Sequence, residues 1–246
     1  MPGLPGLLPM NDKDHPNPHF PTRPAVFDFK LSRLARRLDK GEPVRIATIG
    51  SSSTAGWGDT PPYPGRLEAK LRGKYFPIPV DVLNRGKGGE EAPEQLDRLK
   101  SVLISDEPTV VIWQVGANAI FHGRDLAAVE RAIRDGLDIL ATRPVDVILM
   151  DPQYLPPLLT MERVEAALQM VAIIERLASE AGVNVFRRFD YMRRMRRFER
   201  VSFDRMIEPH DPNRLHQSDW STGLVTQALF NVMVHALTNG ADRRSA

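Results

Sequence analysis

The chain has 246 residues, of which 42% are hydrophobic and 26% are charged. This is ordinary globular composition, so wholesale disorder and a collagen-like structure are excluded, and the length allows a sizeable core. Cysteine is absent, which excludes thiol nucleophiles, disulfides and thiolate metal sites. No apolar run reaches the roughly 18 residues that a membrane span needs.

The net charge is only +2, and the positive charge is concentrated in one segment. Residues 187–200 hold seven arginines and two acidic residues, a local net charge of +5. Phe189, Met192 and Met195 recur there at every third position, which predicts a solvated helix face whose arginine stems cover apolar surface. An anionic surface or polymer is the alternative partner of this segment, but a general nucleic-acid-binding function is not indicated.

The first segment, residues 1–24, contains seven of the 21 prolines. Proline at this density disfavours both helix and sheet, so we expect an extended arm or a disordered leader. It does not read as a clear signal peptide, because no Lys or Arg precedes Lys13 and prolines interrupt the apolar stretch. This favours the cytoplasm and leaves the periplasm or secretion open.

From Phe27 onward the pattern alternates between helix and strand. Apolar residues spaced four and three apart predict a helix that begins at Phe27 and ends before Gly41. Five short apolar runs predict strands at residues 44–49, 80–83, 109–115, 145–150 and 183–186. Helical spacing predicts helices around residues 96–103, 126–140 and 164–177, a shorter one around 67–71, and a last one over 218–237.

Strands that are almost entirely apolar, separated by amphipathic helices, favour a parallel sheet that is covered on both faces. Right-handed crossovers then give a three-layer α/β/α sandwich with a five-stranded parallel sheet. With no internal repeat and no linker, we expect one domain over residues 25–240, followed by a tail at 241–246.

Ligands of open parallel sheets bind beyond the carboxyl ends of the strands. The polar segment 50–56 follows the first predicted strand, 84–89 the second and 116–119 the third, while 211–216 precedes the last helix. Together they bring a hydroxyl, glycine amides, a carboxamide and an imidazole to one rim of the sheet. These groups are the parts of a serine acyl hydrolase: a nucleophile, a base and an oxyanion hole.

The order and spacing of these blocks resemble the SGNH hydrolases, also called GDSL-type esterases. The resemblance implies that Ser52 is the nucleophile and that His216 is the base that takes its proton. It also implies an oxyanion hole made of the amides of Ser52 and Gly89 and the side chain of Asn118. The implied protein is a flavodoxin-like ester hydrolase that works through an acyl-enzyme, needs no metal or cofactor, and acts on acyl or O-acetyl esters of carbohydrates or other small molecules.

The sequence departs from the family pattern at the nucleophile and at the acid. Ser51 stands where the family usually has an Asp before the nucleophile. Asn213 stands three residues before His216, where the family has its acid. We predict that Asp211, five residues before His216, orients the imidazole, and Asn213 is the alternative.

The same residues also allow other interpretations. Segment 50–56 could form a polar turn or a phosphate cradle, but it lacks the Gly-Lys-Ser/Thr ending of nucleotide loops. An acyltransferase would use the same intermediate, and Asn213 at the acid's position motivates a catalytically silent module that binds carbohydrate or acyl groups. His122 and His210 are rival bases, and the histidines show no metal-ligand spacing.

Overall fold

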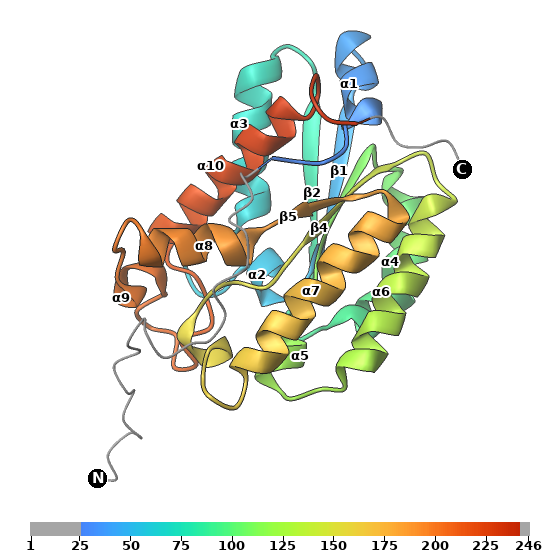
Figure 1. Cartoon of the computed structure of the whole chain (residues 1–246). Helices are drawn as coiled ribbons and strands as arrows, with labels where there is room; N and C mark the ends of the chain where they lie inside the picture. The colour runs from blue at the N-terminus through green and yellow to red at the C-terminus, as the bar shows by residue number, and fades with distance from the viewer. Residues whose placement is uncertain (1–25, 242–246) are drawn as a thin grey trace.

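A twisted parallel sheet runs through the centre of the molecule in the computed structural model, which describes residues 26–241 (Figure 1). In this part of the chain the sheet has five strands in the order β2-β1-β3-β4-β5, and all neighbouring pairs are parallel. The predicted fold class and the five predicted strands are therefore confirmed. The strands are β1 (Val44–Gly50), β2 (Val80–Gly86), β3 (Val110–Gln114), β4 (Asp146–Met150) and β5 (Asn184–Phe186).

Helices cover both faces of the sheet and complete the three layers (Figure 1). One face packs against α4 (Ala92–Asp106), α5 (Ala117–Phe121), α6 (Leu126–Ala141) and α7 (Val164–Ala181). The other face packs against α1 (Ser32–Asp39), α3 (Tyr63–Tyr75), α8 (Arg188–Arg197), α9 (Phe203–Met206) and α10 (Asp219–His235). The remaining short elements are α2 (Ser52–Ala55) and the 3₁₀ helix η1 (Pro156–Leu158).

The strands are apolar at nearly every position because both of their faces are buried. In β3 the side chains of Val111 and Trp113 enter one hydrophobic core, and those of Val110 and Ile112 enter the other. All four are fully buried, which is the pattern expected of a strand in the middle of a covered parallel sheet. Among the described helices, none combines the length and apolar character that spanning a bilayer requires.

The first predicted helix begins later than expected, at Ser32 and not at Phe27. The backbone N–H of Phe29 donates to the side chain of Asn184 in β5, and the N–H of Leu31 donates to the carbonyl of Ala236. These long-range hydrogen bonds hold residues 27–31 in a non-helical path across the sheet edge, so tertiary contacts override the local spacing. The predicted leader at residues 1–24 and the end of the tail lie outside the described residues.

The ends of β1 and β2 lie side by side at the rim where Ser52 begins its helix. Gly50 pairs with Gly86 in the strand register, and a Cβ on Gly86 would lie 2.2 Å from the backbone nitrogen of Ala55. Only glycine permits so close a backbone approach. The second strand is therefore held directly against α2, and its following loop reaches the nucleophile position.

Candidate active site

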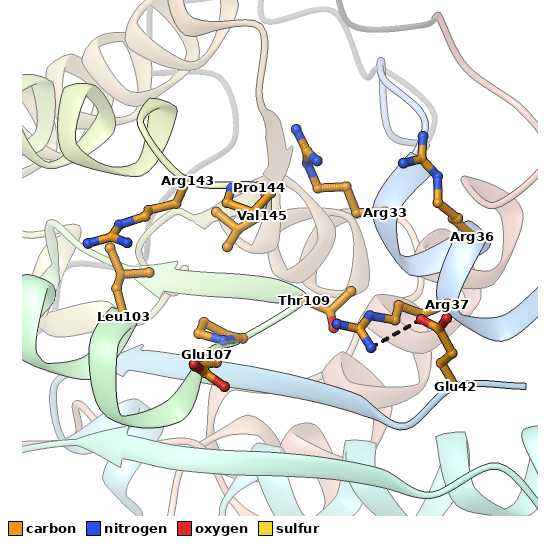
Figure 2. A pocket seen from close by; sticks show the side chains of 11 residues that line it. Arg33, Arg36, Arg37, Glu42, Leu103, Glu107, Thr109, Arg143, Pro144 and Val145 are labelled. Carbon is orange, nitrogen blue, oxygen red and sulfur yellow. Dashed lines mark ion pairs between the residues drawn. The ribbon is translucent and has the colours of Figure 1, made fainter. Parts of the chain in front are cut away.

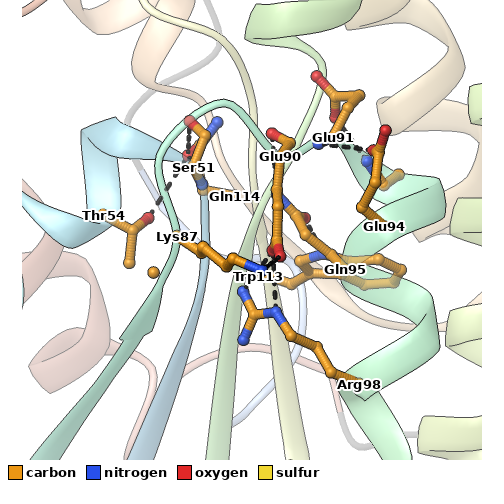
Figure 3. A network of polar contacts seen from close by, with 12 residues as sticks. Ser51, Thr54, Lys87, Glu90, Glu91, Glu94, Gln95, Arg98, Trp113 and Gln114 are labelled. Atoms are coloured by element: carbon orange, nitrogen blue, oxygen red, sulfur yellow. Dashed lines mark hydrogen bonds and ion pairs between the residues drawn. The ribbon is translucent and has the colours of Figure 1, made fainter.

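Ser52 is the first residue of α2, directly after β1, and its side chain is half-buried. The turn before it is held by Gln114 at the end of β3. The side-chain oxygen of Gln114 accepts hydrogen bonds from the backbone N–H and the hydroxyl of Ser51, both at 3.0 Å (Figure 3). Ser51 therefore points into the protein and fixes the turn, while its neighbour Ser52 remains at the rim.

The hydroxyl of Ser52 lies in a chain of short contacts that ends at a buried carboxylate. Its Oγ is 2.8 Å from Nε2 of His216, and Nδ1 of His216 is 2.8 Å from Oδ2 of Asp211. An ionised Asp211 can only accept, so Nδ1 carries the proton and Nε2 is left free to accept from Ser52. The imidazole is 9% exposed and Asp211 is 4% exposed, so the contacts are shielded from bulk water.

Asp211 reaches His216 because the chain between them folds around the carboxylate. Its Oδ2 accepts the backbone N–H groups of Leu215 and His216, both at 2.7 Å, and its Oδ1 accepts the N–H of Asn213 at 3.0 Å. Arg214 adopts a positive φ of 54°, which tightens the turn. The structure thus brings Asp211, and not the side chain of Asn213, against the imidazole.

These hydrogen bonds decide the charge state of Asp211. Burial alone would raise its pKa, but the donated N–H groups of His216 and Asn213 and the neighbouring imidazole lower it more. The net effect is a pKa below the ordinary value for an aspartate. The group that faces Nδ1 is therefore a carboxylate at neutral pH.

The two remaining predicted site residues lie in the segments that follow β2 and β3. Gly89, with φ +80°, follows β2 in a loop where a Cβ on Gly88 would lie 4.0 Å from Cβ of Ser52. Asn118 is the second residue of α5, after β3, and its side-chain nitrogen donates to the carbonyl of Glu90 at 2.9 Å. One N–H of that amide is thereby fixed, and the second has no hydrogen-bond partner among the described residues.

The two loops are joined by a buried carboxylate that the sequence did not single out. Glu91 caps α4 and also accepts backbone N–H groups from Gly116 at 2.7 Å and from Ala119 at 2.9 Å. It is 1% exposed, and burial raises its pKa despite these donors. A capping-box pattern, Glu91 with Glu94 three residues later, was the available sequence signal.

Trp57, the second residue missed from sequence, stacks on the imidazole of His216. The ring centroids are 4.9 Å apart and the planes differ by 10°. The indole therefore covers one face of the base. Its place in the loop just after the nucleophile helix was the only signal in the sequence.

Arg188 is a third missed residue, and it departs from the predicted solvated helix face. It is 1% exposed at the start of α8, where its Nε donates to the carbonyl of Asp151 and its Nη2 to the side chain of Gln153, both at 3.0 Å. Gln153 in turn donates to the carbonyl of Leu215 at 2.9 Å, beside His216. The expected burial of Phe189, Met192 and Met195 is found.

A cavity of about 30 Å³ lies beside Ser52 and His216. Its lining includes Ser52, His216 and Trp57, and also Tyr63 and Arg188. Burial lowers the pKa of Arg188 to about 10 and raises that of Tyr63 to about 12, so both remain protonated at neutral pH. Both of these lining side chains therefore keep their protons as hydrogen-bond donors.

The rival histidines lie elsewhere. His210 is an exposed residue whose Nδ1 is 3.1 Å from Glu208, and exposed His122 packs edge-on against Phe121. Neither lines the cavity at Ser52. Within residues 26–241 no group of three or more His, Asp or Glu side chains is arranged to hold a metal ion.

Comparisons with known proteins agree with this architecture. The model of the non-GDSL lipase-like family matches residues 18–239. No curated relative matches the sequence.

Solved structures resemble the chain in fold. A lipase/acylhydrolase from Enterococcus faecalis is 19% identical, with a TM-score of 0.65 over 82% of this chain and 100% of that one. An acetylxylan esterase from Geobacillus stearothermophilus, in a catalytic mutant, is 16% identical, with a TM-score of 0.64 over 82% and 97%. A two-domain esterase active on acetylated mannans is 18% identical, with a TM-score of 0.70 over 90% of this chain and 59% of that one. At these identities the likeness shows the fold.

Proposed function

The chain belongs to the non-GDSL lipase-like family, and we propose that it is a serine-dependent hydrolase of carboxylic esters. One observation carries the proposal: two contacts of 2.8 Å link the hydroxyl of Ser52 through His216 to the carboxylate of Asp211. A serine hydroxyl is a weak nucleophile at its ordinary pKa, so it needs such a base.

In the proposed reaction Nε2 of His216 takes the proton of Ser52 as its Oγ attacks the acyl carbon. The imidazolium that forms is oriented by Asp211, and it then gives the proton to the departing alkoxide, so the alcohol leaves and the acyl-enzyme remains. A water molecule attacks the acyl carbon with His216 again as base. The products are the free acid and a restored Ser52.

The negative charge on the carbonyl oxygen needs donors that are in place before the reaction. We assign this role to the backbone N–H groups of Ser52 and Gly89 and to the second side-chain N–H of Asn118. The hydrogen bond from Asn118 to Glu90 supports this assignment, because it fixes the orientation of the amide. Loss of one such donor typically costs roughly 2.7–4 kcal/mol of transition-state stabilisation.

The size of the cavity favours a small acyl group. Its volume of about 30 Å³ is comparable to the space that two or three water molecules occupy, since roughly 10–15 Å³ suffices for one. An acetyl group fits such a space and a long acyl chain does not. The structural neighbours whose names mention acetylated xylan and acetylated mannan add support for O-acetyl esters of carbohydrates as substrates.

Labelling with a fluorophosphonate tests the nucleophile without knowledge of the natural substrate. We expect mass spectrometry to find one modified residue, Ser52, and we expect Ser52→Ala to abolish the label. Ser53→Ala is the matched control, because Ser53 also lines the cavity but makes no contact with His216. An unlabelled protein, or a label on another serine, contradicts the proposal.

Product analysis separates hydrolysis from transfer. With p-nitrophenyl acetate and a large excess of a simple sugar, a hydrolase releases free acetate. Acetylated sugar as the main product would assign the chain to the acyltransferases. Faster turnover of p-nitrophenyl octanoate than of the acetate would contradict the assignment of a small acyl group.

A further inference from the structure

A large hollow lies at the amino ends of the strands, opposite the rim that carries Ser52. It has a volume of about 470 Å³, within the roughly 300–1,000 Å³ of small-molecule pockets. Figure 2 shows that arginines surround it: Arg33, Arg36 and Arg37 from α1, and Arg143 from the loop before β4. We propose that this hollow binds a phosphorylated small molecule.

The charges around the hollow do not balance. Arg37 forms an ion pair with Glu42 at 3.1 Å. Within residues 26–241, Arg33, Arg36 and Arg143 form no ion pair. Glu107 is the one further carboxylate of the lining, so the four arginines and two glutamates leave a net charge of +2.

The carboxylate nearest the start of α1 is already engaged by backbone groups. Oδ2 of Asp146 accepts the N–H of Arg33 at 3.0 Å and of Leu34 at 2.9 Å, and the residue is 4% exposed. Asp146 therefore caps the N-terminus of α1. Arg36 and Arg143 are exposed, and Arg33 is half-buried.

The arginines of α1 stand close together in the sequence. Arg33 lies three residues before Arg36 and four before Arg37, so their charges repel along one helix face. Arg33 also lies in the first turn, where the helix dipole disfavours a cation. A dianion between α1 and Arg143 removes the repulsion and complements the dipole.

The lining also indicates the chemical class of the ligand. Guanidinium groups match phosphate oxygens with two parallel hydrogen bonds, and three unpaired arginines suit a dianion better than a single carboxylate. The wall between them is apolar, formed by Leu103, Pro108, Pro144 and Val145. The geometry therefore suits a phosphate group attached to an organic part that covers this wall.

Isothermal titration calorimetry with phenyl phosphate and with inorganic phosphate, at fixed ionic strength, tests the proposal on the full chain. We expect both to bind and phenyl phosphate to bind more tightly, because its ring covers the apolar wall. In the triple variant Arg33→Gln, Arg36→Gln and Arg143→Gln we expect phenyl phosphate affinity to fall by about tenfold or more. Absence of phenyl phosphate binding to the unaltered chain overturns the proposal.

A matched control removes the same charge elsewhere. Arg194, Arg196 and Arg200 are exposed residues of the arginine-rich segment that do not line the hollow. Their triple change to Gln should leave phenyl phosphate binding unchanged. If this control variant loses as much affinity for phenyl phosphate as the first triple variant, the loss reflects only the change in net charge, and the proposal is overturned. Since Arg143 lies in an exposed loop, the single variant Arg143→Gln keeps the test decisive if the triple variant unfolds.

Vesicles distinguish a soluble ligand from a lipid headgroup. The chain should not sediment with phosphatidylcholine vesicles that contain phosphatidic acid. Sedimentation that the hollow's triple variant abolishes and that phenyl phosphate does not reverse would assign the hollow to a membrane surface and overturn the proposed soluble ligand.

Discussion

The carboxylate of Glu91 accepts a hydrogen bond from the backbone N–H of Gly116 at 2.7 Å. Glu91 belongs to the loop after β2, which carries the proposed oxyanion donor Gly89. Gly116 follows β3 and begins α5, which carries the proposed donor Asn118. A second bond, from Ala119 at 2.9 Å, completes the link. One buried side chain therefore sets the separation of the two loops.

Replacing Glu91 with Gln should lower kcat by about 10- to 100-fold, because small displacements of catalytic groups have effects of that size. The new amide would direct N–H groups at backbone donors, so we also expect a loss of roughly 1–3 kcal/mol in the free energy of unfolding. Steady-state kinetics and urea denaturation measure the two effects. Glu94→Gln is the control: its ion pair with Arg124 is partly exposed, so under about 1 kcal/mol should be lost. Equal kinetics in both variants would contradict a positioning role for Glu91.

The contact between Asp211 and His216 predicts which of two neighbours controls the base. Asp211→Asn should lower kcat by roughly 10²–10⁴-fold, the larger figure being that of the same change in a serine protease triad. Asn213→Ala should change it only a few-fold, because Asn213 contributes a backbone N–H that alanine retains. Kinetics with p-nitrophenyl acetate, compared at equal folded fraction by circular dichroism, rank the two. The reverse order would move the orienting role to Asn213.

Most of the fold follows from local patterns in the sequence. The strands could be predicted because a strand that is buried on both faces is apolar throughout, as in Val110–Gln114. The start of the first helix could not, because Phe29 and Leu31 are held by Asn184 and Ala236, more than 150 residues away. Helix spacing carries no information about such partners.

The candidate site was likewise only partly predictable from the sequence. Ser52, Gly89 and Asn118 each follow a strand end, so the chain order alone placed them at one rim. Trp57 and Arg188 acquire their positions from packing: one stacks on His216, and the other is buried where the sequence predicted a solvated arginine face. Burial of a single arginine in a charged run leaves no periodic signal.

The buried carboxyl group of Asp151 predicts a pH dependence of stability. Burial raises its pKa from 3.8 to about 8, and its Oδ2 has no hydrogen-bond partner among the described residues. The folded protein thus holds a proton that the unfolded chain releases at about pH 4. Stability from this group is full below that pH and is lost as the pH rises through about 8.

Asp151→Asn removes the titrating group and keeps an oxygen for the N–H of Phe189, which Asp151 now binds at 2.9 Å. We expect urea denaturation to show a smaller fall in stability between pH 6 and pH 9 for the variant than for the unaltered chain, by on the order of 1–3 kcal/mol. Asp190→Asn is the control. Asp190 lies next to Phe189 on α8 and forms an ion pair with Arg193, and its replacement should not reduce the fall in stability between pH 6 and pH 9. Parallel profiles for all three proteins would mean that Asp151 is ionised throughout.

The stacking of Trp57 on His216 predicts a role for the indole in the proton transfer. The imidazole gains a positive charge when it takes the proton of Ser52, and an aromatic face beside a cation stabilises it by roughly 0.5–2 kcal/mol. Trp57→Ala should therefore lower kcat by about 2- to 30-fold, while Trp57→Phe, which retains an aromatic face, should recover part of the loss. Presteady-state release of p-nitrophenol reports acylation directly and checks the ranking. If the alanine and phenylalanine variants acylate equally fast, the indole acts by filling space and not through its aromatic face.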